Sequence, residues 1–373
     1  MEPKDLRQLI LSATEPFLIK NQLNWAPLTW TLDDWQQVLK DEKLIFRCGR
    51  KLFTKEPQWE RKTVTKNATF KEFLSSMTTE NQNWMYFDYK YLKEWFHGIK
   101  DLKDSINWSK FGFPELTFED STIWIGSAGA HTPCHVDTYG CNLIAQIYGR
   151  KQWVLCSPET DLKPTRVPYE ESSIYSNLNF FSPNVEDFTG VKNCRKIILE
   201  PGDVLFVPHK WWHYVENLDT GISINVWLPL PIDDKERLKE SLVQLFIAQI
   251  TKNLNKEEKD MILNPNSDES IESTSIHASI NLIKMCTNIV KSTKEPEDNI
   301  NEESGTYYKK FSFLHPIPIL SDEDFLTFLK EQKNRFNNIE NEAGSCDTKE
   351  LANLVNAFTH ADVISLIESK LLQ

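Results

Sequence analysis

Residues 132–153 read TPCHVDTYGCNLIAQIYGRKQW, and the second half of this segment contains two apolar runs separated by the turn Gly149-Arg150. Similar short runs, rich in Ile, Val, Trp and Phe, recur on both sides of it. They occupy residues 122–126, 142–148, 152–156, 196–199, 204–207 and 221–228. Turn residues such as Pro201-Gly202-Asp203 separate them. Several short strands at this spacing predict an all-β barrel or sandwich.

The residues before this β region predict a mixture of short elements. Residues 16–20, PFLIK, predict a strand, and Thr31 is placed to cap a helix whose first turn is acidic. Residues 69–77 and 89–98 have the apolar spacing of short helices. Inside the β region, residues 168–184 show no regular periodicity and predict a long insertion between strands.

After residue 231 the sequence changes to a helical pattern. Apolar residues at helical spacing predict helices at residues 233–253, 278–290, 321–335 and 348–372. Residues 254–275 and 291–306 are polar and acidic and predict loops or linkers. We therefore expect a mixed N-terminal part at residues 1–120, a β core at 121–230 and a helical C-terminal appendage at 231–373. The length of 373 residues is compatible with about two domains.

Composition narrows the classes of partner and compartment. The net charge is −12, and an acidic chain binds phosphate backbones poorly, so a nucleic-acid partner is disfavoured. No apolar run approaches the roughly 20 residues that span a bilayer, so no membrane partner is expected. The 7 cysteines include no C-x-x-C pair, and the N-terminus has no signal-peptide pattern. These features predict reduced thiols and a cytoplasmic location, with the nucleus as the alternative.

An H-x-D pair, His135 and Asp137, lies between two predicted strands, and His213 follows far downstream in PHKWWH. Alternate residues of a strand share one face, so His135 and Asp137 can converge on one point. Two imidazoles and one carboxylate suit Fe(II) and leave positions open for a 2-oxoacid and O2. H-x-D alone is a weak signal, and a turn with a hydrogen-bonded histidine is its simpler explanation. The order of the surrounding motifs makes the metal interpretation specific.

Two further histidines precede the triad histidines by four residues. His131 and His209 would form zinc-binding pairs on helices, but Pro133 and Pro208 disfavour helices there. We expect both to lie in loops or beside the metal ligands. Cys134 and Cys141 flank the H-x-D pair and are expected to fill apolar space.

The motifs PCHVDTYGCNL, GRKQWVLCSPE, PTRVPYEESS and VLFVPHKWWHYVE begin at residues 133, 149, 164 and 204. In this order they resemble the JmjC family of 2-oxoglutarate- and Fe(II)-dependent oxygenases. The resemblance covers roughly residues 12–230 and is nearest to the hydroxylase-like branch, within a group named for association with a small heat-shock protein. It implies a mainly β fold: a double-stranded β-helix, or cupin barrel, with N-terminal helices and a helical C-terminal appendage. It also implies Fe(II), 2-oxoglutarate and O2 as cofactor and cosubstrates.

The resemblance also assigns roles to individual residues. His135, Asp137 and His213 match the iron ligands. Lys151 matches the lysine that pairs with the far carboxylate of 2-oxoglutarate, and a lone lysine among Ile, Tyr, Trp and Val would otherwise bury an unpaired cation. A turn lysine pointing to solvent is the alternative. The remaining matches are Thr132 and Tyr86 for the same carboxylate, and Asn142 and Asn225 for polar residues near the metal.

Several of these matches have competing explanations. Tyr89 competes with Tyr86 because the register of WMYFDYKYL is ambiguous. Thr132 can be a loop residue, and each asparagine can be a strand amide bonded to the backbone. Trp227 can form the wall of the pocket or pack in the core.

The expected function is an oxygenase that hydroxylates a side chain of a protein substrate. The first alternative is a weakly catalytic or non-catalytic adaptor that binds a small heat-shock protein. Hydroxylation of a tRNA base and lysine demethylation are further alternatives, the former disfavoured by the acidic charge. The helix predicted at residues 233–253 can form a homodimer with a second copy or cover the end of the barrel.

Overall fold

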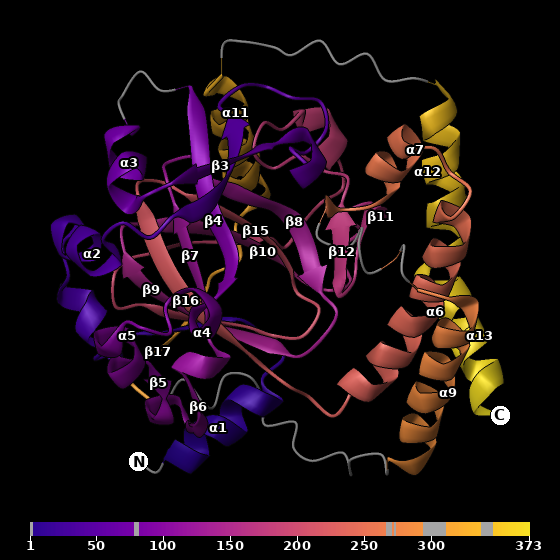
Figure 1. Ribbon diagram of the computed structural model, residues 1–373, viewed down its shortest axis with the longest axis horizontal. Coiled ribbons are helices and arrows are strands. Elements are labelled where there is room, and N and C mark those ends of the chain that lie inside the picture. The colour runs from indigo at the N-terminus through magenta and orange to yellow at the C-terminus, as the bar shows by residue number, and fades with distance from the viewer. Residues whose placement is uncertain (1–2, 78–81, 266–270, 272–273, 294–310, 337–345) are drawn as a thin grey trace.

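The computed structural model describes residues 3–77, 82–265, 271, 274–293, 311–336 and 346–373. Two antiparallel sheets face each other and form a barrel, with helices around it (Figure 1). Nine strands form the larger sheet. In spatial order they are β17 (Leu314–Pro316), β1 (Phe17–Ile19), β14 (Val204–Val207), β9 (Cys141–Tyr148), β16 (Gly221–Leu228), β7 (Thr122–Gly126), β4 (Asn83–Tyr91), β2 (Leu44–Arg50) and β3 (Val64–Ala68).

The smaller sheet carries the motif strands. In spatial order it contains β11 (Pro164–Glu170), β12 (Ser173–Ser176), β8 (His131–Asp137), β15 (Trp212–Asn217), β10 (Lys151–Cys156) and β13 (Arg195–Leu199). A short pair, β5 (Asn107–Trp108) and β6 (Phe113–Thr117), stands apart.

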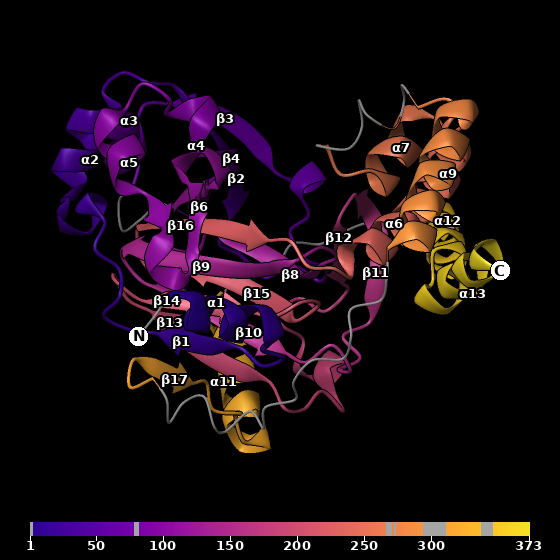
Figure 2. The ribbon, with the colours of Figure 1, turned by 90° about the horizontal axis from the view of Figure 1, so that it is seen from below.

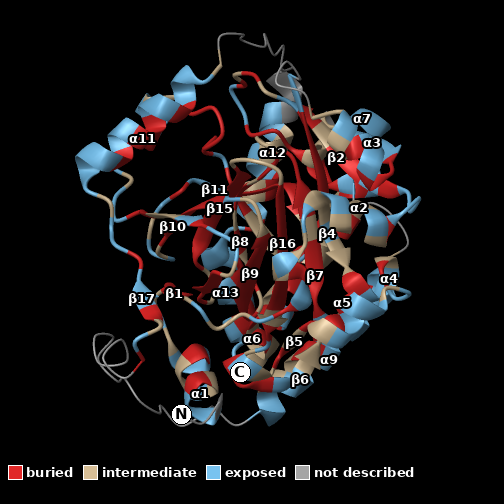
Figure 3. Ribbon diagram, turned by 90° about the vertical axis from the view of Figure 1, so that its left-hand side faces the viewer, coloured by how far each residue is buried: buried red, intermediate tan, exposed pale blue. Residues whose placement is uncertain are grey.

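The central strands are apolar on both faces because both faces are covered. Along β9, Leu143 and Ala145 belong to the core beneath the N-terminal helices, whereas Ile144 belongs to the core between the two sheets. Successive side chains of a strand point to opposite faces, so one strand contributes to two cores. This explains why the β region reads as nearly continuous apolar runs. Figure 3 shows these strands as the most buried part of the molecule.

Short helices pack on the outer face of the larger sheet (Figure 2). They are α1 (Pro3–Ser12), α2 (Leu32–Leu39), α3 (Phe70–Ser75), α4 (Leu92–Trp95) and α5 (Lys100–Ser105). Thr31 caps α2 and Thr69 caps α3, each with a capping box in which an acidic residue bonds back to the cap nitrogen. The predicted cap at Thr31 is therefore confirmed.

The C-terminal helices lie in two places. A bundle beside β11 contains α6 (Asp233–Thr251), α7 (Lys256–Ile262), α9 (Ile276–Ser292), α12 (Cys346–Phe358) and α13 (Ala361–Leu372) (Figure 1). The chain between α9 and α12 returns to the barrel, where β17 pairs with β1 and α11 (Asp322–Asn334) packs on the outer face of the smaller sheet. The proposed divisions at residues 120 and 230 stay predictions.

Three expectations about local structure need correction. Residues 168–176, the first part of the insertion expected at 168–184, belong to the β11–β12 hairpin, because two prolines and the charged residues Arg166, Glu170 and Glu171 hide its strand pattern. Residues 83–91 form β4, so the helix expected at 89–98 shrinks to α4. Residues 256–262 form α7 inside an expected loop. Most of the expected linker at residues 291–306 lies outside the described residues.

The cysteine expectation is also wrong in one respect. The structure joins Cys156 to Cys194 in a disulfide, whereas Cys48, Cys134, Cys141 and Cys286 are free. Leu155 of β10 pairs with Arg195 of β13, so the adjacent cysteines meet across two strands that are far apart in sequence. No helix in the described part of the chain is long and apolar enough to cross a membrane.

Candidate metal centre and adjoining pockets

Two neighbouring strands of the smaller sheet bring the predicted metal ligands together. His135 on β8 lies directly opposite His213 on β15, and Asp137 follows on the same face of β8. A bulge in β8 makes His135 oppose His213 and Thr132 oppose Val215, so between these pairs two residues of β8 lie opposite one residue of β15. This extra residue turns both Thr132 and His135 into the barrel. Potential ligand atoms of the triad all lie within 4.8 Å of one another.

Backbone carbonyls fix both imidazole rings. His135 Nδ1 lies 2.9 Å from the carbonyl oxygen of Pro133, and His213 Nδ1 lies 2.9 Å from that of Trp211. Each Nδ1–H therefore donates outward, and each Nε2 points toward Asp137, at 3.5 Å from His135 and 3.9 Å from His213. This orientation turns both Nε2 atoms toward the position that a metal would occupy.

The carboxylate of Asp137 is oriented in the same way. Trp227 Nε1 donates to Asp137 Oδ2 at 2.9 Å, so Trp227 supports a ligand rather than acting only as a wall. Burial alone would raise the pKa of Asp137, but the two histidines and the Trp227 hydrogen bond hold it well below its usual value. Burial, reinforced by His135, lowers the pKa of His213 to about 4. Burial opposes the protonation of His135, but the adjacent carboxylate of Asp137 outweighs it and raises the pKa of His135 above its usual value. The triad offers one carboxylate and two imidazoles, a donor set that fits Fe(II).

Lys151 lies on the same barrel interior, with 2% of its surface exposed. Its Nζ donates to Ser223 Oγ at 2.6 Å and contacts Tyr86 Oη at 3.4 Å. None of the described carboxylates forms an ion pair with it, and burial lowers its pKa to about 7. The solvent-facing alternative is therefore wrong. A buried ammonium without a counter-charge is unfavourable, so this end of the pocket fits a ligand carboxylate.

The other predicted residues surround the same space. The inner pocket is lined by Tyr86, Thr132, Asn142, Lys151, Ser223 and Asn225, together with the triad and the rings of Trp124, Trp153 and Trp227. The Thr132 hydroxyl bonds to Tyr86. Asn225 Nδ2 donates to Asn142 Oδ1 at 2.9 Å, so each asparagine bonds to a side chain rather than only to backbone. Tyr89 lies elsewhere, 45% exposed, and does not line this pocket.

Two residues of the inner pocket, Ser223 and Trp124, were not among the site residues predicted from the sequence. Ser223 accepts the hydrogen bond of Lys151, and Trp124 Nε1 donates to Asn225 Oδ1 at 2.7 Å. Both lie on predicted strands. Their alternation with Ile222 and Ile123, which face the outer core, was the signal that could have placed them inside the barrel.

An outer cavity of about 330 Å³ adjoins the inner pocket, and Thr132, His135 and Asp137 line both. It lies between β4, the β11–β12 hairpin and the start of α6. His131 and His209 are not part of the triad. His131 faces the opposite side of β8, where it stacks on Phe181 at 3.9 Å.

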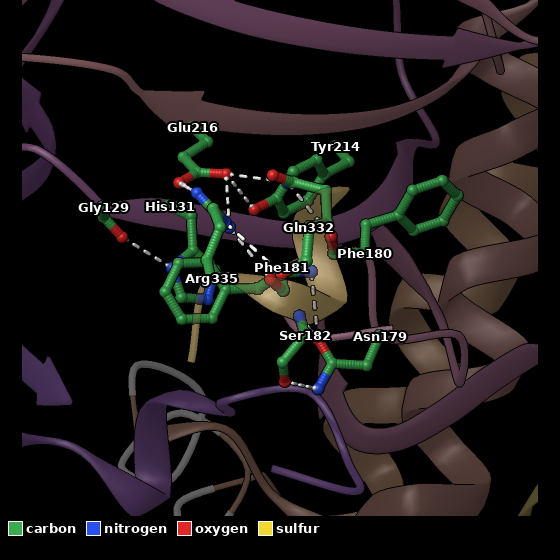
Figure 4. A network of polar contacts seen from close by, with 10 residues as sticks. All are labelled: Gly129, His131, Asn179, Phe180, Phe181, Ser182, Tyr214, Glu216, Gln332 and Arg335. Atoms are coloured by element: carbon green, nitrogen blue, oxygen red, sulfur yellow. Dashed lines mark hydrogen bonds and ion pairs between the residues drawn. The ribbon is translucent and has the colours of Figure 1, made fainter. Parts of the chain in front are cut away.

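A buried polar network supports the metal strands from behind (Figure 4). Glu216 of β15 is 1% exposed and pairs across the sheet with His131 of β8. Its carboxylate accepts from Arg335 Nη1 at 2.5 Å, Gln332 Nε2 at 3.1 Å and Tyr214 Oη at 2.8 Å. Arg335 and Gln332 lie at the end of α11, so a C-terminal helix completes the environment of a strand that carries a metal ligand.

The amino-acid sequence of this chain is similar to those of known proteins. A profile of the cupin-like domain family matches residues 3–233. The chain belongs to the cupin-like JmjC family. The HSPB1-associated protein 1 homolog of Danio rerio is 35% identical to this cupin-like chain over 322 residues, which is 81% of this chain and 71% of the relative. The expected double-stranded β-helix with N- and C-terminal helices is therefore confirmed.

Other relatives are similar over shorter shares of their length. HSPB1-associated protein 1 of Homo sapiens is 38% identical over 286 residues, covering 72% of this cupin-like chain and 59% of the relative. The corresponding alignment with the Bos taurus protein covers 58% of that relative, so the chain spans less than two thirds of both. Lysine-specific demethylase JMJ30 of Arabidopsis thaliana is 28% identical over 231 residues, 60% of this chain and 51% of the relative.

Proposed function

We propose that this protein is an Fe(II)- and 2-oxoglutarate-dependent oxygenase that hydroxylates a side chain of a protein substrate. One observation carries the proposal. A single pocket has a His/Asp/His triad at one end and, at the other, a buried lysine with no carboxylate partner among the described residues. The triad end fits the metal, and the lysine end fits the far carboxylate of 2-oxoglutarate.

Different residues would bind the metal and the 2-oxoglutarate. His135, Asp137 and His213 would hold Fe(II), and Lys151, Tyr86 and Thr132 would bind the far carboxylate of 2-oxoglutarate. Together, iron and 2-oxoglutarate supply the activation of O2 that hydroxylation requires.

The chain itself positions these groups and shields them. Trp227 and the two backbone carbonyls fix the orientation of the triad, so the ligands need no rearrangement when the metal binds. The Asn142–Asn225 pair holds a polar wall beside the triad. The rings of Trp124 and Trp153 exclude water from the pocket, which strengthens the attraction between Lys151 and a bound carboxylate.

Anaerobic titration of the metal-free protein with Fe(II) and 2-oxoglutarate tests the proposal. We expect a visible metal-to-ligand absorption band that saturates, disappears in His213→Ala and weakens in Lys151→Ala. His209→Ala is the matched control, because His209 lies just before the tryptophan pair that His213 follows but does not line the inner pocket. A folded wild-type protein that gives no band would overturn the oxygenase proposal.

A second proposal concerns the partner. Relatives of this chain are named for association with HSPB1, and we infer that this chain binds a small heat-shock protein. A pull-down with a purified small heat-shock protein tests it, and His135→Ala shows whether binding depends on the metal. If the wild type and His135→Ala both bind the small heat-shock protein, and the wild type gives no absorption band, an adaptor would be favoured over an enzyme. No binding by the wild type would reject the partner.

A further inference from the structure

A disulfide joins two parts of the smaller sheet that are far apart in sequence. Cys156 is the last residue of β10, and Cys194 directly precedes β13, 38 residues further along the chain. Both residues are 1% exposed. The other cysteines whose side chains the structure describes are free: Cys48, Cys134, Cys141 and Cys286. Such a bond among free thiols is more typical of a redox-responsive site than of a disulfide-stabilised scaffold.

At one end, the disulfide adjoins the strand that carries a metal ligand. Cys156 lies opposite Trp212 of β15, and the neighbouring pair of these two strands is Leu155 with His213. Strand β10 also carries Lys151 at its other end. The covalent link is therefore one residue pair away from the triad, on two strands that both line the inner pocket.

At the other end, the disulfide adjoins the segment that leads into α11. The backbone nitrogen of Leu320 donates to the carbonyl oxygen of Cys194 at 2.8 Å. Arg195 Nη1 donates to the carbonyl oxygen of Ile317 at 2.7 Å, and the backbone of Arg195 forms a bridge with Ile319. The segment before α11 is thus fastened to the chain at the disulfide.

Helix α11 covers the bond. Phe325, Phe328 and Leu329 of this helix belong to the same apolar cluster as both cysteines. Arg335, at the end of the helix, bonds to Glu216 of β15. Because the sulfurs are buried in this cluster, a reductant should reach them only when α11 moves away. The same helix therefore covers the disulfide and supports a metal strand.

Reduction would release a constraint in this part of the barrel. A disulfide that closes a long loop stabilises a protein chiefly by restricting its unfolded chain. In addition, two sulfurs that are no longer bonded must separate to a non-bonded contact, and in a close-packed cluster this displaces their neighbours. The neighbour that can move is α11, since it lies on the outer face of the sheet and strands β10 and β15 are paired on both sides.

We propose that Cys156 and Cys194 are a reversible redox site that sets how firmly α11 is held on the smaller sheet. Oxidation removes two protons and two electrons from the two thiols and forms one S–S bond. A small disulfide such as glutathione disulfide accepts them and leaves as two thiols, and a dithiol reverses the step. The oxidised form holds α11 closed, and the reduced form lets it open more often. This site is independent of the oxygenase function, because neither cysteine lines the inner pocket.

Incubation of the full, metal-free chain in oxidising and reducing glutathione buffers tests the site. Free thiols are trapped with an alkylating reagent, and the peptides of a digest are identified by mass spectrometry. We expect peptides linked through Cys156 and Cys194 in the oxidising buffer, and both cysteines alkylated after treatment of the native protein with dithiothreitol. The oxidised protein should melt about 5 °C or more above the reduced protein. Hydrogen exchange in α11 should be at least about threefold slower in the oxidised protein.

Variants connect the bond to α11. Arg335→Met frees the end of the helix, so dithiothreitol should reduce its disulfide at least about threefold faster than that of the wild type. Lys333→Met, an exposed position of the same helix, should match the wild type. Cys156→Ala/Cys194→Ala should melt and exchange equally in both buffers, whereas Cys286→Ala, which removes a free buried thiol, should keep the difference.

Four results would contradict the proposal. They are the absence of linked peptides in every buffer, a bond that dithiothreitol does not reduce in the native protein, equal hydrogen exchange of α11 in the two states, and a redox difference that persists in the double alanine variant. The comparison of the two states of the wild type needs no substitution, so it decides the question even if the double variant folds poorly.

Discussion

At the scale of single residues, Lys151 should destabilise the ligand-free fold, although it is needed to bind a ligand carboxylate. Its pKa is about 7 in the folded protein and roughly 10.4 in an unfolded chain. Between these two pH values the unfolded state binds more protons than the folded state. The free-energy cost of burying the charged Lys151 is therefore complete below about pH 7 and declines as the pH rises. We expect Lys151→Met to stabilise the ligand-free protein at pH 6.5 by about 2 kcal/mol, with a smaller difference at pH 9. Thermal denaturation of both proteins at the two pH values measures this.

Addition of 2-oxoglutarate and Fe(II) should reverse that order. The wild type gains stability from a bound carboxylate that Lys151→Met cannot pair, so its melting temperature should rise more than that of the variant, whose triad still binds Fe(II). Because binding requires a protonated Lys151, the affinity for 2-oxoglutarate should fall as pH increases above about 7, by up to roughly tenfold per unit. An affinity independent of pH between 6.5 and 8.5 would show that Lys151 does not hold the carboxylate.

Trp227 supplies a second prediction for a single residue. Trp227→Phe keeps the ring but removes the donor to Asp137 Oδ2. Such supporting bonds usually change metal affinity by about 10- to 100-fold, and we expect at least a tenfold loss in Fe(II) affinity by anaerobic titration. Trp153→Phe is the control, because Trp153 stacks near His213 but donates to no described acceptor. A loss of equal size in both variants would indicate a general packing effect.

At the scale of elements, α11 is predicted to stabilise the back of strand β15. Arg335→Met removes the cation that faces the buried carboxylate of Glu216 and leaves Gln332 and Tyr214 as its only described donors. The Arg335 side chain is 31% exposed, so the loss should lie below that of a fully buried pair, at about 2 kcal/mol. Chemical denaturation measures it. Lys333→Met on the same helix is the control, and Glu216→Gln should restore much of the loss.

The elements also show which strands could be predicted from the sequence and which could not. Strands β9, β10, β14 and β16 were predictable because they are buried on both faces and leave continuous apolar runs. The β11–β12 hairpin was not, because Arg166 is buried by a pairing with Glu240 of α6, a contact that no local pattern reveals.

The candidate site shows the same division. The residues of H-x-D, G-R-K and W-W-H could be read from motifs, and the structure brings them into one pocket. The bond from Trp227 to Asp137 and the walls of the outer cavity depend on strand pairing and on segments such as residues 59–60 and 264, which no motif links to the site.

At the scale of the whole molecule, the C-terminal part has two different relations to the barrel. The helices α12 and α13 contact the bundle of α6, α7 and α9 and reach β11 through Asn356, which accepts from the backbone nitrogen of Arg166 at 2.7 Å. In contrast, β17 extends the larger sheet, and α11 covers the smaller sheet with Phe325 and Phe328. The barrel should therefore depend on β17 and α11 far more than on the last two helices.

Two truncations separate these relations. A chain that ends at residue 345 loses α12 and α13 and should keep the absorption band of the Fe(II)–2-oxoglutarate complex, with a modest decrease in melting temperature. A chain that ends at residue 312 also loses β17 and α11, which exposes the edge of β1, uncovers Phe180 and Phe188 and leaves Glu216 without Arg335. We expect it to aggregate or to melt well below the longer truncation and to lose the band. Equal stability of the two truncations would mean that the barrel folds independently of everything after α9, and α11 would then be a passive cover rather than part of the support for the metal strands.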